Sequence, residues 1–387
     1  MNNRKYLEIF FFFFLIILVH SYIPTINETL SASGSADFNW QPTKCVFEGI
    51  NHYSSYLNKD GRCLIIFSQL GEYAQGLYIL LYPFSLLDWD TAKLTWLITN
   101  IFLLFFTIYF LGKKFQLNLI EILFLIFVVF YSIIIRVNLI MGQHTILILT
   151  FLSLPFIWKN KLTYFLSGIS YFKYNIGYGL FLMYITSKKY RFVLLSLIPG
   201  ILGWIIYSLL TDTNLIENLF QPFRLALFNA TNGNVVNNLF LFSFIKEISF
   251  LEEYNYFIII IFTFLLNIIF VLKINKISDD LLKLSLLCLL ILISTPHWGH
   301  DNILFIPFLI YSLKNYNLNK NLFRLNLFFG IYFLHLFKGI QKYNAKLLQF
   351  LDFNDNIVEN SYLLLSYLNL IILLFLIIIN LKFHKKI

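Results

Sequence analysis

The sequence predicts an all-α integral membrane protein that crosses a bilayer about ten to twelve times. Of its 387 residues, 59% are hydrophobic and only 13% are charged, which is about half the charged share of a soluble domain. The apolar residues form long runs separated by short basic clusters. A helix satisfies its own backbone hydrogen bonds inside a bilayer, and about 20 apolar residues suffice to span it. We therefore expect a single membrane domain over residues 1–387.

The chain begins with an apolar run, Tyr6–Ile23, that follows Arg4 and Lys5 and resembles a signal peptide. Because many more apolar runs follow, we expect an uncleaved first helix. The next stretch, residues 24–93, is mostly polar and is predicted to be a long outer loop after this helix. Its apolar piece Gly76–Leu87 is too short to cross a bilayer, so we expect it to be re-entrant or interfacial.

The remaining spans are predicted from the later apolar runs, which a second polar loop at residues 211–253 divides into two groups. Before this loop we expect spans at Leu94–Gly112, Leu117–Ile135, Leu139–Trp158, Leu162–Phe172, Tyr174–Thr186 and Tyr190–Leu210. After it we expect spans at Tyr254–Lys273, Leu281–Pro296, Ile303–Leu313, Leu325–Phe337 and Tyr362–Lys382. Several runs are shorter than about 17 residues, so we expect some half-helices or tilted segments.

The basic clusters assign the two membrane faces. With the N-terminus inside, an alternating topology places most of them on the inner face, as the positive-inside rule requires. The same rule accounts for the net charge of +9, so this charge does not indicate a nucleic-acid partner. The loops 24–93, 211–253 and 296–302 then lie outside, together with the segments near Arg136 and Lys173.

The first polar loop contains two of the three cysteines, Cys45 and Cys63. No Cys-x-x-Cys motif is present, so a structural zinc site is not expected. In an oxidising compartment these cysteines can pair, but two separate thiols fit the sequence equally well.

Four places at the expected outer face combine polar residues suited to chemistry, and the first is Asp37. A carboxylate near the membrane surface and flanked by aromatic residues can have a raised pKa and act as a general base. A solvated loop aspartate is the simpler interpretation. Glu48, Asp60 and Glu72 lie in the same loop and are equally suited by composition.

The second and third places lie around the middle of the chain. Gly142-Gln143-His144 follows Arg136; glycine allows close backbone approach, and Gln143 offers paired donors and acceptors. Interfacial residues at a helix start would look the same. Lys173 lies between two short apolar runs, so it either binds a phosphate or extends to lipid head groups.

The fourth place is the segment 296–302, an outer motif with two histidines. His297, His300 and Asp301 are closely spaced, as in some metal sites, but no Glu-x-x-His pattern supports a metal. A histidine that transfers a proton or binds phosphate is favoured, and polar residues that end a helix are the remaining interpretation. We expect no metal and no other cofactor.

Taken in order, these motifs resemble those of glycosyltransferase family 87, the polyprenol-phosphate-mannose-dependent mannosyltransferases with the GT-C fold. Three motifs match well: an aspartate after the first span (Asp37), a Gly-Gln element (Gly142-Gln143) and a lysine after a Gly-rich helix (Gly168, Lys173). Four motifs match more loosely. Gly49-Ile50-Asn51-His52-Tyr53 has His52 in place of the usual Pro, and Tyr82-Pro83-Phe84 lacks the second Pro. Gly233-Asn234 is followed by Val236 in place of Ser, and Pro296, Trp298 and His300 are more closely spaced than in the family. The resemblance covers roughly residues 6–315.

The resemblance implies a GT-C-like helix bundle and a hexosyltransferase at the outer face of a bacterial plasma membrane. A hexose, mannose in the family, would pass from a polyprenyl phosphate to a hydroxyl of a lipid or glycan acceptor, with inversion. Membrane lipids would surround the protein, and no nucleic acid would bind. The implied roles are Asp37 as general base, Lys173, Arg136 and His300 at the donor phosphate, and Gln143, Asn234, Tyr53, Tyr82 and His297 at the sugar or acceptor.

Two other classes of membrane protein also handle lipid-linked sugars. A transporter or flippase is expected to show inverted repeats and ionisable residues at mid-bilayer. No repeat is evident, and Glu121 and Lys283 lie near inner span ends. A polymerase or ligase usually has its main outer loop late in the chain and rich in Arg, whereas here the largest loop follows the first span.

Overall fold

The computed structural model confirms the all-helical class. It describes residues 16, 19–20, 22–31, 34–58, 63, 72–231, 255–294, 299–316, 320–334 and 371–382, and within these ranges every regular element is a helix. Two described helices, α6 (Trp89–Lys114) and α12 (Tyr190–Leu210), are each long and apolar enough to cross a membrane. The pair α7 (Leu119–Tyr131) and α8 (Ile133–Met141) forms a third candidate span with a 61° bend.

Other expected spans are divided into shorter helices. The predicted span Leu139–Trp158 is interrupted at residues 142–144, so that α9 begins only at Thr145 and ends at Ile157. The predicted span Leu162–Phe172 consists of α10 (Lys161–Ser167) and the 3-10 helix η1 (Gly168–Phe172). The predicted helix Tyr174–Thr186 is found unchanged as α11.

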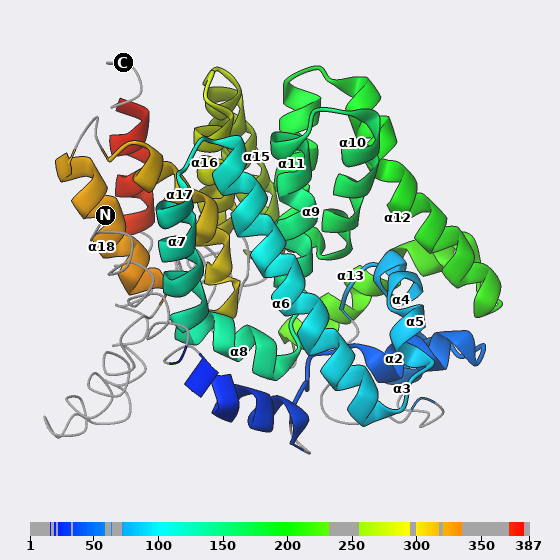
Figure 1. Ribbon diagram of the computed structural model, residues 1–387. Helices are drawn as coiled ribbons and strands as arrows, with labels where there is room; N and C mark the ends of the chain where they lie inside the picture. The colour runs from blue at the N-terminus through cyan, green and yellow to red at the C-terminus, as the bar shows by residue number, and fades with distance from the viewer. Residues whose placement is uncertain are drawn as a thin grey trace, which may run out of the picture.

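Two helices are buried on almost all sides. Nearly every residue of α9 is buried, and in α16 (Asp280–Ser294) all residues from Leu284 to Ser294 are buried. A helix that is apolar all round belongs in the interior of a bundle. These helices pack with α11, α17 (Ile306–Lys314) and α15 (Asn255–Asn275), as Figure 1 shows.

The outer helices α6 and α12 expose apolar side chains instead. Phe102 on α6 is 63% exposed, and Leu194 and Leu209 on α12 are 67% and 76% exposed. Exposed apolar faces of this size suit contact with lipid. This pattern is that of an integral membrane protein.

One end of the bundle, in the lower half of Figure 1, holds six helices. These are α2 (Trp40–Phe47), α3 (His52–Asn58), α4 (Gln75–Leu80), α5 (Tyr82–Ser85), α8 and α13 (Leu215–Thr231). The predicted loop 24–93 is therefore largely helical in its described part, without a span before α6. At this end α4 packs closely on α12, because both helices have a glycine at the contact: a Cβ on Gly203 of α12 would collide with the backbone of Gly76 of α4.

The opposite end carries ion pairs made by lysines that the sequence places on the inner face. Lys314 Nζ lies 2.8 Å from Asp279 Oδ2, and Lys159 pairs with Asp280. Lys159 follows the end of α9, and Lys314 is the last residue of α17. The described helices thus separate these basic residues from the end that holds Asp37 and Lys173.

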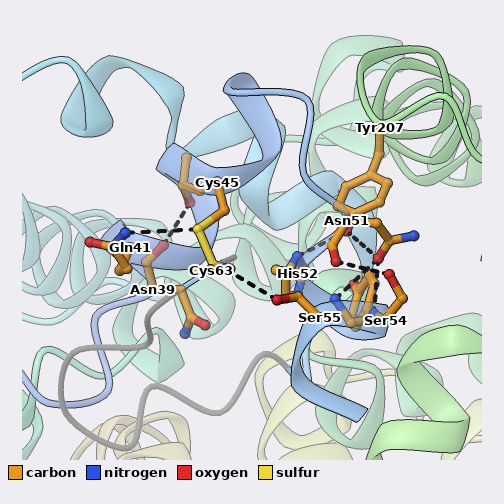
Figure 2. Close-up of a disulfide and its surroundings, with 11 residues drawn as sticks. Asn39, Gln41, Cys45, Asn51, His52, Ser54, Ser55, Cys63 and Tyr207 are labelled. Atoms are coloured by element: carbon orange, nitrogen blue, oxygen red, sulfur yellow. Dashed lines mark hydrogen bonds between the residues drawn. A yellow bond between two sulfur atoms is a disulfide. The ribbon is translucent and has the colours of Figure 1, made fainter. Parts of the chain in front are cut away.

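The two cysteines of the first polar loop form a disulfide. Cys45 of α2 is bonded to Cys63, with the Cα atoms 5.8 Å apart. Figure 2 shows this bond beside the start of α3. The structure therefore settles a pairing that the sequence left open.

Candidate active site

The segment that carries Asp37 is held against the break between α8 and α9. The amide of Ser35 donates to the carbonyl of Ile140 at 2.6 Å, and that of Asp37 donates to Met141 at 2.8 Å. Gly142 closes α8 with a φ of +67°, and a Cβ there would lie 2.8 Å from the Cβ of Phe38. Glycine at this position therefore meets two requirements, a left-handed backbone and a close neighbouring segment.

Aromatic residues fix the same segment from the other side. Phe38 is fully buried and stacks on Trp96 of α6, with ring centroids 5.1 Å apart and planes at 3°. Trp96 Nε1 donates to the carbonyl of Gly142 at 2.9 Å. Trp40 Nε1 donates to the carbonyl of Phe84 at 3.1 Å. The backbone on both sides of Asp37 is thus anchored.

Asp37 lies in a partly buried position with one amide partner. Gln143 Nε2 donates a hydrogen bond to Asp37 Oδ2. Burial raises the pKa of the Asp37 carboxyl to about 6, a shift opposed by the Gln143 hydrogen bond and by Lys173 and reinforced by Asp301. A carboxyl with this pKa is mostly ionised at neutral pH and can accept a proton from a hydroxyl.

Lys173 follows η1 and forms a buried ion pair. Its Nζ lies 2.6 Å from Asp301 Oδ1, and the two side chains are 9% and 1% exposed. Lys173 Nζ also donates to Thr145 Oγ1 at 2.9 Å, and Thr145 Oγ1 donates to Asp301 Oδ1. The three side chains therefore form a closed triangle.

The two groups of side chains belong to one site. Gln143 and Thr145 are separated by a single residue, and each holds one of the two carboxylates, Asp37 and Asp301. Lys173 and Asp301 both influence the pKa of Asp37 electrostatically. The site thus combines a potential base with a cation and an amide, the groups needed to move a proton and to bind an anion.

His144 lies in sequence between Gln143 and Thr145, the residues that bond the two carboxylates. Its ring is fully buried, 4.9 Å from the ring of Tyr73 and 5.2 Å from that of Trp96. Neither ring nitrogen has a hydrogen-bond partner in the described part of the chain. Burial, reinforced by Lys173, lowers its pKa to about 3, so the ring is neutral at physiological pH.

A second buried polar network joins the first loop to α12 and α13. Tyr207 OH lies 2.9 Å from His52 Nδ1 and 3.2 Å from Asn51 Oδ1, as Figure 2 shows. Asn51 Nδ2 donates to Gln221 Oε1 at 2.8 Å. Tyr53 donates to the carbonyl of Tyr73 at 2.5 Å. Tyr53 therefore supports the segment next to the site through Tyr73.

Two other residues with expected roles make contacts with other parts of the chain. Arg136 Nη2 is 3.5 Å from the carbonyl of Tyr131, and its guanidinium lies 5.9 Å from the Tyr131 ring centroid. Tyr82 is 38% exposed and its ring packs on Phe47 at 3.9 Å. The roles proposed for Arg136 and Tyr82 stay predictions.

The remaining candidates differ in how far the structure describes them. Asn234, His297 and Asp60 lie outside the described residues, and the side chain of His300 does too. Glu48 is exposed and Glu72 is partly buried. Within the described residues, no group of three or more His, Cys, Asp or Glu side chains is arranged to hold a metal.

From the sequence, Asp301 is interpreted only as a possible metal ligand beside the neighbouring histidines, His144 only as part of the motif that follows Arg136, and Thr145 not at all. The partner of Asp301 in the structure, Lys173, is 128 residues away in sequence. A pairing over that distance leaves no local pattern.

The chain matches the model of a known protein family. The model of glycosyltransferase family 87 matches residues 73–296, more than half of the chain. No curated protein and no solved structure matches the chain. The matched range includes Gln143, Thr145 and Lys173, whereas Asp37 precedes it and Asp301 follows it.

Proposed function

Because the chain belongs to glycosyltransferase family 87, we propose that this membrane glycosyltransferase moves a hexose from a polyprenyl phosphate to an acceptor hydroxyl. Mannose is the sugar to test first, and the acceptor is a lipid or a glycan. The observation that supports this function best is the meeting of Asp37, Gln143 and Lys173 at one end of the bundle.

In the proposed reaction Asp37 is the general base. It takes the proton of the acceptor hydroxyl as that oxygen attacks the anomeric carbon. The bond between this carbon and the phosphate oxygen breaks, and its electron pair leaves with the polyprenyl phosphate. A single displacement of this kind inverts the anomeric configuration. A pKa of about 6 suits this step, because the carboxylate is ionised at neutral pH and still basic enough to share the proton.

The donor phosphate is proposed to bind at Lys173, with Arg136 and His300 as further cationic or hydrogen-bonding groups. A phosphate is already a good leaving group, so it needs stabilisation of negative charge more than protonation. Lys173 acts electrostatically on Asp37 and opposes the rise in its pKa. Gln143, Asn234, Tyr53, Tyr82 and His297 are proposed to contact the sugar or the acceptor.

We place the site on the outer face of the membrane of a bacterium. The Cys45–Cys63 disulfide supports this orientation, because disulfides persist in oxidising compartments outside the cytoplasm. The lysine-rich opposite end fits the inner face. At this boundary a lipid-linked donor can keep its chain in the bilayer while its head group reaches the site.

The test is a transfer assay with the full-length protein in nanodiscs. Radiolabelled polyprenyl-phosphate mannose is incubated with a membrane lipid extract and either wild type, Asp37→Asn or the control Asp88→Asn. Asp88 is exposed and caps α6 by accepting from the Thr91 amide, a role that Asn can keep. We expect label in a new product with wild type and Asp88→Asn only. Equal activity of Asp37→Asn would remove Asp37 from the mechanism.

A further inference from the structure

Asp301, which forms a buried ion pair with Lys173, has no role in the reaction proposed above. Both side chains are almost fully buried, and the distance between the charged atoms is 2.6 Å. Such a pair is a poor source of stability, because removing two charges from water costs about as much as their attraction returns. Its position, with both charges acting on Asp37, suggests a functional reason.

The hydrogen-bond geometry limits what Lys173 can do. An ammonium group has three N–H donors. Within the described residues, one is directed to Asp301 and one to Thr145. Thr145 in turn donates to Asp301, so the rotation of the ammonium is fixed on two sides. In the part of the chain that the structure describes, the third N–H has no partner and can donate to a substrate.

The net charge of the ion pair affects how tightly the site binds the polyprenyl phosphate product, which is an anion. An unpaired buried ammonium would bind a phosphate tightly before and after the reaction. A carboxylate in contact with the ammonium weakens this attraction, because it lowers the net local charge. The free N–H can still stabilise the charge that develops on the leaving phosphate.

From these observations we propose that Asp301 is a positioning residue for Lys173, which directs one N–H of the ammonium to the donor phosphate and limits how tightly the polyprenyl phosphate product is held. This inference rests on the proposed function and adds to it a residue that controls product release. Thr145 completes the arrangement by bonding both charged groups.

The test compares product binding with turnover in full-length protein in nanodiscs. The probe is undecaprenyl monophosphate, and its Kd is measured beside kcat and KM for transfer. The variants are Asp301→Asn, which removes the charge, and Asp301→Glu, which keeps it. Asp279→Asn is the matched control, because Asp279 forms a similar 2.8 Å ion pair with Lys314 at the opposite end of the bundle.

For Asp301→Asn we expect roughly tenfold tighter binding of undecaprenyl monophosphate together with a lower kcat. Asp301→Glu should keep a product Kd within about twofold of wild type, with a lower kcat because the ammonium is displaced. Asp279→Asn should change neither quantity. A purely structural Asp301 would instead lose product binding and turnover together.

Two results would overturn the inference. One is weaker product binding in Asp301→Asn, and the other is a kcat unchanged in both Asp301 variants. If Asp301→Asn does not fold, Asp301→Glu decides, and a product Kd shifted by more than tenfold would contradict the proposal. Wild type that neither binds the monophosphate nor transfers sugar would show that the proposed function itself fails.

Discussion

Replacing Asp37 by Asn should abolish turnover and stabilise the folded protein at neutral pH. The pKa of Asp37 is raised from 3.8 to about 6, chiefly by burial. The folded protein therefore binds this proton more tightly than the unfolded chain does. Between about pH 4 and pH 6 the folded state holds the proton while the unfolded state loses it, so stability falls as pH rises.

The pKa difference sets the size of this effect. A change from 3.8 to about 6 corresponds to at most about 3 kcal/mol of stability, present below pH 3.8 and lost as pH rises through about 6. Asparagine is neutral at every pH and avoids this loss, and its carbonyl can still accept the hydrogen bond of Gln143. The variant should therefore be more stable than wild type by about 2–3 kcal/mol at pH 7.5 and by little near pH 4.

The assay is urea unfolding in detergent, followed by tryptophan fluorescence from pH 4.5 to 8. We expect the difference between Asp37→Asn and wild type to grow across this range. Asp88→Asn is the control, since Asp88 is exposed. A variant that is less stable than wild type at pH 7.5, or a difference that does not change with pH, would refute the reasoning and give Asp37 a structural role.

Three further predictions concern the same end of the bundle. The value of kcat/KM should fall tenfold per pH unit below about pH 6, because protonated Asp37 cannot take the acceptor's proton; a profile without this acid limb would exclude Asp37 as the base. Gly142→Ala should lower stability by about 1–2 kcal/mol in urea unfolding and reduce sugar transfer, because φ at this position is +67° and the added Cβ would lie close to Phe38. Gly200→Ala is the control: no atom lies near its added Cβ, so neither stability nor transfer should change. Cys45→Ser should cost about 2–4 kcal/mol in urea unfolding, and reductant should destabilise wild type but not this variant; equal sensitivity to reductant in both would contradict the prediction.

The sequence predicts helices well where hydropathy alone decides them. Tyr174–Thr186 and Tyr190–Leu210 are found with the expected bounds. The predicted span Leu117–Ile135 is instead bent at Ser132, whose hydroxyl donates to the carbonyl of Leu334 at 2.5 Å. That contact joins residues 202 positions apart, so local hydropathy does not contain it.

The candidate site was predictable to a similar extent. Asp37, Gln143 and Lys173 were expected together because their motifs resemble one family in order, and the structure brings Gln143 to Asp37 and places Lys173 within electrostatic range. The ion pair of Lys173 with Asp301 was not expected, since nothing near Asp301 in sequence indicates a basic partner. Phe38 packs tightly against Gly142 and Trp96, so these uncharged residues help to fix the position of the neighbouring Asp37.

We propose that this chain transfers a sugar from a polyprenyl phosphate with Asp37 as the base. The most direct measurement is a single-turnover experiment that follows sugar transferred and polyprenyl phosphate released, together with donor binding, for wild type and Asp37→Asn. We predict equal amounts of the two products with wild type, and unchanged donor binding without either product with Asp37→Asn. Release of polyprenyl phosphate without a glycosylated product, or full turnover by Asp37→Asn, would contradict the account.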